Sequence, residues 1–372
     1  MPLTKHLALT FLALAASCAF AAEETFTILA PSRDSSTLIT VITVVKGDKV
    51  ELTKGLQLPL EFPPTTIAAS ATKPLFYVTG NQVVEGQPAA AVIDFSESTT
   101  EESKVSVTNF DVAHGYAYLS LDRKENFLLG ADYREGFVDV YELDESGFPA
   151  TLVSTLNEGR KNAHCILPSP NNQFVYIPYV KDTNALYQYK FDPETGALSP
   201  LEKLDAGPPE GTGPRHMAYH PTKPYVYFSN EQHVGVSVYK KGSDGQLVNV
   251  QVCDTTGIEL PEDGRSASDI VITPDGKYLF TGLRAARHGL DHVSRWAVQE
   301  NGLVKHLGLT KADEVPWGMA ISPGGEYLVV TGFGSGTLMV FRIKDGGDLT
   351  RVATMDWDPK ISDVVTWAPE SE

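Results

Sequence analysis

The chain has few cysteines and a shortage of positive charge for its 372 residues. It contains three cysteines, and Lys and Arg total 30 against 47 Asp and Glu, which gives a formal net charge of −17. So few cysteines exclude a fold that depends on a disulfide framework. A strongly acidic chain is repelled by the phosphates of nucleic acid and by anionic membrane surfaces. We therefore expect no nucleic-acid partner.

Common metal and nucleophile motifs are also missing. The sequence has no Cys-x-x-Cys, His-Glu-x-x-His or EF-hand pattern and no Gly-x-Ser-x-Gly elbow. Asp-Gly pairs such as Asp275-Gly276 fall where turns are expected, which explains them without calcium. The polar stretch Arg287–His292 is interpreted as a surface loop, because ligands so close together rarely surround one ion without a turn motif. We expect no metal and no cofactor.

No apolar run is long enough to predict a membrane span. The stretch LALTFLALAASCAF follows Lys5 and His6, and Ala19-Phe20-Ala21 has the small-x-small pattern of a cleavage site. These features predict that residues 1–21 are a secretory signal peptide and that the protein is exported, to a periplasm or the extracellular space. Lipidation at Cys18 is an alternative, but Ala15 stands where a lipobox carries Leu.

A motif of the form Ser/Thr-Pro-x-Gly-x-Tyr-Leu-Phe recurs along the chain. Clear copies are TPDGKYLF at Thr273 and SPGGEYLV at Ser322. Looser copies begin at Ser70, Ser120, Ser169 and His220, so the successive gaps are 50, 49, 51, 53 and 49 residues. A period near 50 residues, with a strand, a turn and a second strand in each unit, is typical of a β-propeller.

The two ends of the chain supply the parts of a further unit. Val364–Pro369 resembles an inner strand with nothing after it, and Thr25–Pro31 and Leu38–Val45 resemble the strands that are missing. We therefore predict an all-β, seven-bladed propeller with four antiparallel strands per blade, closed by N- and C-terminal strands that share one blade. Residues 22–372 are expected to form this single domain.

Counting from the repeated turn identifies the residues at one mouth of the central channel. There the first residues of each inner strand meet the last residues of the second strand. Most units carry small residues at these positions, but neighbouring units in the middle of the chain carry charge, which predicts a small-molecule site. The candidates are His164, Arg215, His216, Glu231, Asp269 and Arg284, with Tyr133 and Trp317 from flanking units.

Some of these residues have a simpler structural interpretation. Asp269 is expected to form an ion pair between blades, for which Arg215 is a possible partner. Two arginines and Glu231 at one opening exceed what a single ion pair requires, and this favours function. Cys165, next to His164 on its strand, should point into the core.

The stretches that carry these residues resemble the lactonase propeller family, which includes propeller-type 6-phosphogluconolactonases and carboxy-cis,cis-muconate cyclases. The most similar stretches are Gly213–Glu231, Ser266–Arg284 and Asn162–Pro178. The resemblance to the cyclases implies catalytic roles for four residues, His164, Arg215, Glu231 and Arg284. Tyr133, His216, Asp269 and Trp317 are then expected to bind substrate.

Three positions depart from the phosphogluconolactonase pattern. Tyr118 and Val271 stand where histidines are usual, and Trp317 replaces an arginine. The loss of these basic groups argues against a phosphorylated substrate. The resemblance implies metal-independent opening of a lactone, or the reverse cyclisation of an unsaturated carboxylate.

In that chemistry, Arg215 and Arg284 would hold a carboxylate and stabilise an oxyanion. Glu231 or His164 would move the proton. A non-catalytic propeller that binds a ligand or a protein is an alternative, because the fold alone does not imply catalysis. A quinone- or metal-dependent dehydrogenase is less favoured, because its ligand spacing is missing.

Overall fold

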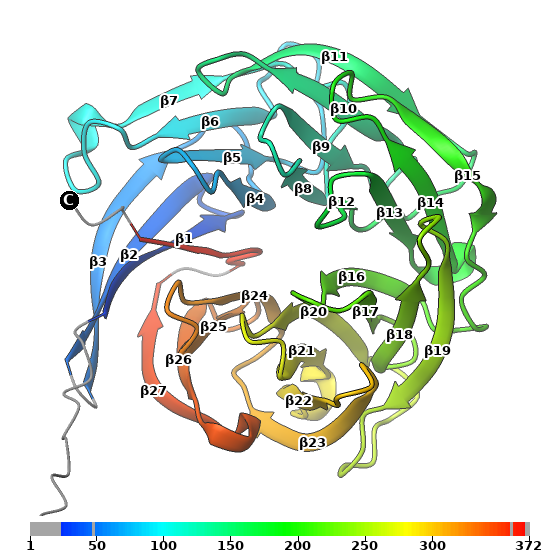
Figure 1. Cartoon of the computed structure of the whole chain (residues 1–372). Coiled ribbons are helices and arrows are strands. Elements are labelled where there is room, and N and C mark those ends of the chain that lie inside the picture. Colours follow the sequence, from blue (N-terminus) through cyan, green and yellow to red (C-terminus); the bar gives the residue numbers. More distant parts are fainter. Residues whose placement is uncertain (1–23, 47–48, 358–359, 369–372) are drawn as a thin grey trace, which may run out of the picture.

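The computed structural model describes residues 24–46, 49–357 and 360–368. These residues form seven four-stranded antiparallel sheets, arranged as blades around a central channel (Figure 1). The predicted seven-bladed propeller is thus confirmed. The predicted signal peptide, residues 1–21, lies outside the described residues. Within the described ranges, no helix has the length and apolar character needed to cross a bilayer.

Six blades follow one another along the chain, and each runs from an inner strand at the channel to an outer strand at the rim (Figure 1). The first blade consists of β4 (Thr66–Ala69), β5 (Leu75–Thr79), β6 (Ala90–Asp94) and β7 (Ser106–Asn109). The second consists of β8 (Tyr118–Leu121), β9 (Phe127–Ala131), β10 (Val138–Leu143) and β11 (Pro149–Leu156). The third consists of β12 (Leu167–Pro168), β13 (Phe174–Tyr179), β14 (Ala185–Phe191) and β15 (Leu198–Asp205).

The next three blades repeat this order. The fourth consists of β16 (Pro214–Tyr219), β17 (Tyr225–Asn230), β18 (Gly235–Lys241) and β19 (Leu247–Asp254). The fifth consists of β20 (Ser266–Ile272), β21 (Tyr278–Arg284), β22 (His292–Val298) and β23 (Val304–Lys311). The sixth consists of β24 (Pro316–Ile321), β25 (Tyr327–Gly332), β26 (Thr337–Ile343) and β27 (Leu349–Asp356). Short 3-10 helices lie in the connections, at η1 (Glu102–Lys104), η2 (Lys181–Thr183), η3 (Ala286–His288) and η4 (Asp345–Gly347).

The seventh blade is built from both ends of the chain. Its inner strand is β28 (Val365–Trp367), which pairs antiparallel with β1 (Glu24–Ser32). β2 (Thr37–Lys46) and β3 (Lys49–Pro59) complete the sheet. In Figure 1 the red C-terminal strand accordingly lies beside the blue N-terminal strands. The predicted closure by a shared blade is confirmed.

The repeated motif forms the turn between the first and second strands of a blade. Its first residue caps the turn, since Thr273 Oγ1 accepts a hydrogen bond from the Tyr278 amide at 3.1 Å. Its fourth residue adopts a positive φ, 72° at Gly276 and 81° at Gly325. Glycine adopts this conformation without a steric penalty, which explains its place in the motif.

The second copy of the motif begins two residues later than predicted. Its first residue is Asp122 rather than Ser120, because Asp122 Oδ1 accepts the Phe127 amide at 2.8 Å in the capping position. Glu125, three residues on, has the positive φ of 56° that marks the fourth position. The clear copies of the motif begin with Ser or Thr, but an aspartate side chain also caps such a turn.

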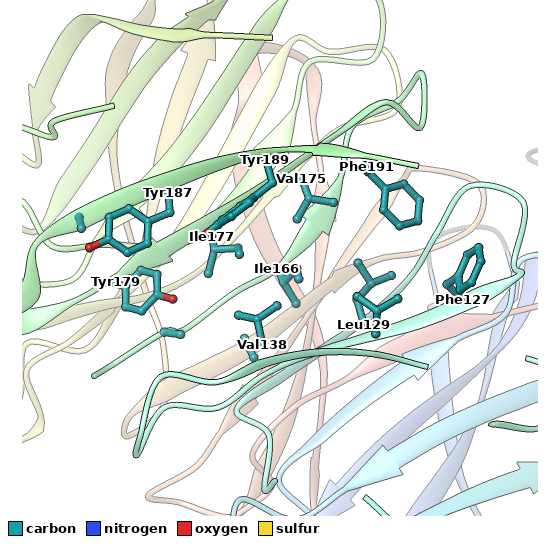
Figure 2. Packing of buried hydrophobic residues seen from close by; sticks show 14 residues of the cluster. Phe127, Leu129, Val138, Ile166, Val175, Ile177, Tyr179, Tyr187, Tyr189 and Phe191 are labelled. Carbon is teal, nitrogen blue, oxygen red and sulfur yellow. The ribbon is translucent and has the colours of Figure 1, made fainter. Parts of the chain in front are cut away.

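Apolar side chains fill the space between neighbouring blades. Figure 2 shows one such layer, in which Phe127, Leu129 and Val138 of the second blade pack with Val175 and Ile177 of the third. All five side chains are buried. Each fully buried residue of this kind contributes about 1.5–3 kcal/mol relative to exposure. Because similar layers lie between other blades, the ring is rigid enough to position a site at its axis.

Tyrosine hydroxyls also join adjacent blades. The bonds run from a second strand to a glycine carbonyl in the next blade: Tyr77 to Gly147 at 2.6 Å, Tyr176 to Gly245 at 2.7 Å and Tyr227 to Gly302 at 3.0 Å. These three tyrosines therefore link neighbouring blades, in addition to being residues that favour β-strands.

We predict that Tyr227→Phe lowers the free energy of unfolding by about 1 kcal/mol, because it leaves the buried Gly302 carbonyl without its partner. The control is Tyr225→Phe on the same strand, where the side chain is half buried and its hydroxyl can exchange with water. Urea denaturation of the two variants measures the difference. Equal losses in both would contradict a role for the bond between blades.

Candidate functional site

A cavity of about 400 Å³ opens at the channel mouth where the inner strands begin. Residues from all seven blades line it. The lining includes seven of the eight predicted site residues, namely Tyr133, His164, Arg215, His216, Glu231, Arg284 and Trp317. The eighth, Asp269, is not part of the lining but is hydrogen-bonded to His216.

Irregular pairing at the start of the inner strands explains how consecutive residues reach the cavity. The register of β16 against β17 shifts between Pro214 and Met217, the segment that holds Arg215 and His216. In a regular strand these two side chains would point to opposite faces, whereas a bulge re-aims one of them. The same shift occurs in the fifth blade between Ala267 and Ile270.

Glu231 lies between two buried arginines. Its Oε2 is 3.0 Å from Arg215 Nε and 3.6 Å from Arg284 Nη2, and His164 Nε2 is 3.9 Å away. Arg284 Nη2 also donates to the Ala267 carbonyl at 2.7 Å. Burial, with repulsion from Arg215, lowers the pKa of Arg284 to about 9, so it remains a cation at neutral pH. The cluster thus carries two positive charges against one negative charge.

Trp317 forms a wall beside both guanidinium groups. The ring centroid is 4.5 Å from Arg284 Cζ and 5.6 Å from Arg215 Cζ, and Phe333 packs against the indole at 4.7 Å. A cation over an aromatic face is attracted by about 0.5–2 kcal/mol. The tryptophan that departs from the family pattern therefore holds Arg215 and Arg284 in place.

The other two departures from the family pattern also have a place in the structure. Tyr118 lies edge-on to the His216 ring, with centroids 5.0 Å apart. Val271 packs instead with the apolar cluster around Phe280.

Asp269 has a different partner from the one expected. Its Oδ1 is 2.8 Å from His216 Nδ1, and its Oδ2 accepts the Met319 amide at 2.9 Å. The possible ion pair with Arg215 is not formed, because the Arg215 Nε approaches Glu231 instead. Burial raises the pKa of Asp269 to about 6.

Both cavity histidines are neutral at pH 7. Burial, with the nearby charge of Arg215, lowers the pKa of His164 and of His216 well below 6.5. The two rings lie 5.1 Å apart, and Tyr133 packs edge-on against His164 at 5.2 Å. A neutral imidazole can accept a proton, which a charged one cannot.

Several buried polar atoms of the cavity wall have no hydrogen-bond partner among the described residues. They are His164 Nδ1, Arg215 Nε and Nη1, His216 Nε2, Arg284 Nε and Ser362 Oγ. Of these, Arg215 Nε lies 3.0 Å from Glu231 Oε2 as an ion pair without the alignment of a hydrogen bond. Buried polar atoms are nearly always paired in folded proteins. Their concentration around one cavity indicates a surface built to bind a polar ligand.

Sequence reasoning missed nine of the sixteen residues of the lining, and the charged or aromatic ones among them are Arg33, Arg134, Phe333 and Asp363. The first three lie in turns after the second strands, which the count from the repeated motif did not cover. Asp363 could have been found, because Ser362-Asp363-Val364 repeats the pattern Ser268-Asp269-Ile270. Burial raises its pKa to about 7.

A larger cavity, of about 780 Å³, lies at the opposite face among the first, sixth and seventh blades. It is lined by side chains such as Phe95, Pro323 and Trp367 and contains neither histidine nor arginine. Although this cavity is larger, its lining does not indicate a catalytic site.

The remaining sequence predictions concern metals and cysteines. The described ranges contain no cluster of three or more His, Cys, Asp or Glu side chains that could hold a metal ion. In the polar stretch Arg287–His292, Asp291 accepts the amides of Ala285 and Val315, both at 3.1 Å, which gives it a structural function. Cys165 is fully buried, as predicted, and both it and Cys253 are free thiols.

Comparison with known proteins gives sequence relatives. Two relatives named 6-phosphogluconolactonase, from Enterobacter sp. (strain 638) and Klebsiella pneumoniae (strain 342), are 31% and 32% identical over 230 and 233 residues. Each match covers 61% of this chain and 66% of the relative, just under two thirds of the relative's length.

Solved structures share the fold. The periplasmic gluconolactonase PpgL of Pseudomonas aeruginosa superimposes with a TM-score of 0.79 at 19% identity, covering 93% of this chain and 99% of PpgL. A protein of Lactobacillus plantarum gives a TM-score of 0.77 at 18% identity, covering 93% and 100%. The family model described as "Lactonase, 7-bladed beta-propeller" matches residues 26–365. The chain therefore belongs to the lactonase family of seven-bladed β-propellers.

Proposed function

We propose that the protein hydrolyses a lactone, in the first place a sugar-acid lactone, in the cavity around Glu231. The observation that carries this proposal is the set of unpaired, buried N–H and imidazole nitrogen atoms that converge there. The activities named for the two sequence relatives and for PpgL support it. A volume of about 400 Å³ is also suited to a single sugar-sized ring.

The two guanidinium groups would supply the electrostatic stabilisation. Attack by water on a lactone carbonyl places negative charge on the carbonyl oxygen, and donors fixed in advance stabilise that charge at no cost in reorganisation. Arg215 Nη1 and Arg284 Nε are the free donors of the pair. Glu231 holds both side chains in position through ion pairs from its Oε2 atom to the two guanidinium groups.

Hydrolysis also needs a general base in the cavity that can take a proton from the attacking water. The sequence suggested Glu231 or His164, and both line the cavity. No step in this scheme uses a metal ion, and we propose that the reaction is metal-independent.

The substrate proposed here is unphosphorylated and met outside the cytoplasm. Trp317, in place of the family's arginine, offers an aromatic face beside Arg215 and Arg284 rather than a further charge there, while Arg33 and Arg134 line other parts of the cavity. The signal-peptide pattern of residues 1–21 supports export, and sugar phosphates are cytoplasmic metabolites. A muconate-type cyclisation is the second candidate, because paired arginines also bind a carboxylate well.

We predict that Arg215→Ala lowers kcat/KM for glucono-1,5-lactone about 100-fold or more, because an oxyanion donor is lost. The measurement is base uptake in a pH-stat, corrected for spontaneous hydrolysis. The matched control is Arg351→Ala. Arg351 lies on the outer strand β27, and the substitution breaks its ion pair with Asp313. This variant should retain wild-type activity.

Arg215 is only 1% exposed, so truncation of its side chain to alanine can unfold the protein. Arg215→Lys therefore provides a second test. Lysine keeps the charge but lacks the planar fork of donors. A folded variant of either kind with wild-type kcat/KM would overturn the proposal, whereas an unfolded Arg215→Ala with a folded, fully active Arg215→Lys would show that the arginine serves structure.

Removal of metal ions gives a separate prediction. Protein dialysed against EDTA should retain its kcat/KM, because arginine side chains perform the part that a Lewis acid would otherwise play. The control is the same protein with Ca²⁺, Mg²⁺ or Zn²⁺ added back. Activity that disappears with EDTA and returns with one ion would contradict metal independence.

A further inference from the structure

We propose that His216 is the general base of this site and that Asp269 positions it, an assignment that rests on the lactone hydrolysis proposed above. The sequence analysis expected His216 to bind substrate, and Asp269 to bind substrate or to form an ion pair between blades. Their geometry assigns them instead to proton transfer.

The two residues form a hydrogen-bonded imidazole–carboxylate pair. His216 Nδ1 lies 2.8 Å from Asp269 Oδ1, so the proton on Nδ1 is donated to the carboxylate. The lone pair of the neutral ring is then on Nε2. That atom is buried and has no partner among the described residues, in a side chain that lines the cavity. A carboxylate that fixes the tautomer of a histidine in this way is a recurrent arrangement for general bases.

Asp269 is itself held by the fold. Its Oδ2 accepts the amide of Met319 in the next blade at 2.9 Å, and its Oδ1 accepts its neighbour's amide, Ile270 N, at 2.8 Å. The ring of His216 is confined by Tyr118 on one side and His164 on the other, with centroids 5.0 and 5.1 Å away. The base is thus placed by three blades besides its own, which limits its rotation.

The two bases suggested by the sequence are less suited to the task. Glu231 Oε2 is shared between Arg215 at 3.0 Å and Arg284 at 3.6 Å, so this oxygen is committed to holding the donors. His164 has an unpartnered Nδ1, and its Nε2 is 3.9 Å from Glu231, beyond hydrogen-bond distance. Among the described residues, no side chain is hydrogen-bonded to His164 so as to fix its tautomer. We assign Glu231 as a positioning residue for the arginines.

The reaction follows from these positions. His216 Nε2 takes a proton from water as the water oxygen bonds to the lactone carbonyl carbon, and the carbonyl electron pair moves to its oxygen beside Arg215 and Arg284. When the tetrahedral intermediate collapses, the ring C–O bond breaks. The proton on His216 Nε2 passes to the departing ring oxygen, which leaves a hydroxy acid and the original imidazole.

The first test is His216→Ala assayed with glucono-1,5-lactone. We expect kcat to fall by about 10²–10⁴-fold, the usual contribution of a general base, with KM within a few-fold because the arginines remain. Added imidazole should restore part of kcat, since it can occupy the space of the missing ring. Loss of kcat without any rescue, together with an equal loss of affinity for gluconate, would show that His216 only binds or supports the site.

The matched control is His114→Ala. His114 Nδ1 lies 2.6 Å from Asp139 Oδ2 in the second blade, which is also an imidazole–carboxylate pair with a buried carboxylate, but His114 is partly exposed and does not line the cavity. This variant should keep wild-type kcat and gain nothing from imidazole. A similar loss in both histidine variants would indicate a general effect on folding and would overturn the assignment.

The positioning role of Asp269 is tested with Asp269→Asn. The remaining amide oxygen can still accept the Met319 amide. An NH2 group in the place of Oδ1 faces His216 Nδ1 and forces the ring proton onto Nε2, and it leaves the Ile270 amide without its acceptor. We expect kcat to fall about 100-fold or more, with KM nearly unchanged, a somewhat lower melting temperature and no rescue by imidazole. A kcat within three-fold of wild type would contradict the role.

The pH profile gives an independent measurement. Burial and the charges of Arg215 and Arg284 hold the pKa of His216 well below 6.5, and the base works only when unprotonated. The acid limb of kcat/KM should therefore lie below pH 6.5 and disappear in His216→Ala. The titratable and charged groups that face His216 are Asp269, Arg215, Arg284, His164 and Tyr118. An acid limb that persists unchanged in His216→Ala would overturn the assignment.

Failure of this assignment is distinguishable from failure of the proposed function. A wild-type protein without lactonase activity overturns the function. A wild-type protein that is active, sensitive to Arg215→Ala and insensitive to His216→Ala overturns the base alone.

Discussion

Closure of the ring by the two ends of the chain is the constraint on which the rest of the structure depends. β28 pairs with β1, and Asp363 next to it accepts hydrogen bonds from the Thr66 hydroxyl at 2.9 Å and the Ile67 amide at 3.1 Å in the first blade. These contacts join the last blade to the first. Because the circle is closed, seven inner strands begin around one axis, and residues 251 positions apart in the sequence, Arg33 and Arg284, line one cavity.

The closed ring also buries three charged side chains of the site away from the water that would otherwise stabilise them. Arg215 is fully buried, and Arg284 and Glu231 are about nine-tenths buried, which is costly unless partners compensate. Glu231, the face of Trp317 and the Ala267 carbonyl compensate in part, but Arg215 Nη1 and Arg284 Nε keep unused donors. A substrate that develops negative charge during reaction would satisfy them better than a neutral ground state, and this preference is the basis of catalysis.

Much of the fold and of the site could be predicted from the sequence, for a physical reason. In four blades the turn after the inner strand has a capping side chain at its first position and a residue with positive φ at its fourth, Glu125, Asn172, Gly276 or Gly325. Such turns mark the position of the inner strand, and the site residues follow by counting. Asp122 and Glu125 satisfy the same turn with other side chains, which is why that copy was placed two residues early. The partner of Asp269 was unpredictable, because it depends on bulges that only the folded sheets reveal. Arg33 and Arg134 were missed because their loops have no repeated pattern.

The most direct test of the central claim is a crystal structure of the protein with gluconate, the product of the proposed reaction. We predict the carboxylate of gluconate within hydrogen-bond distance of Arg215 Nη1 and Arg284 Nε, with the hydroxyl that was the ring oxygen of the lactone donating to His216 Nε2. Gluconate bound only in the larger cavity on the opposite face, or absent from the Glu231 cavity at saturating concentration, would contradict the account.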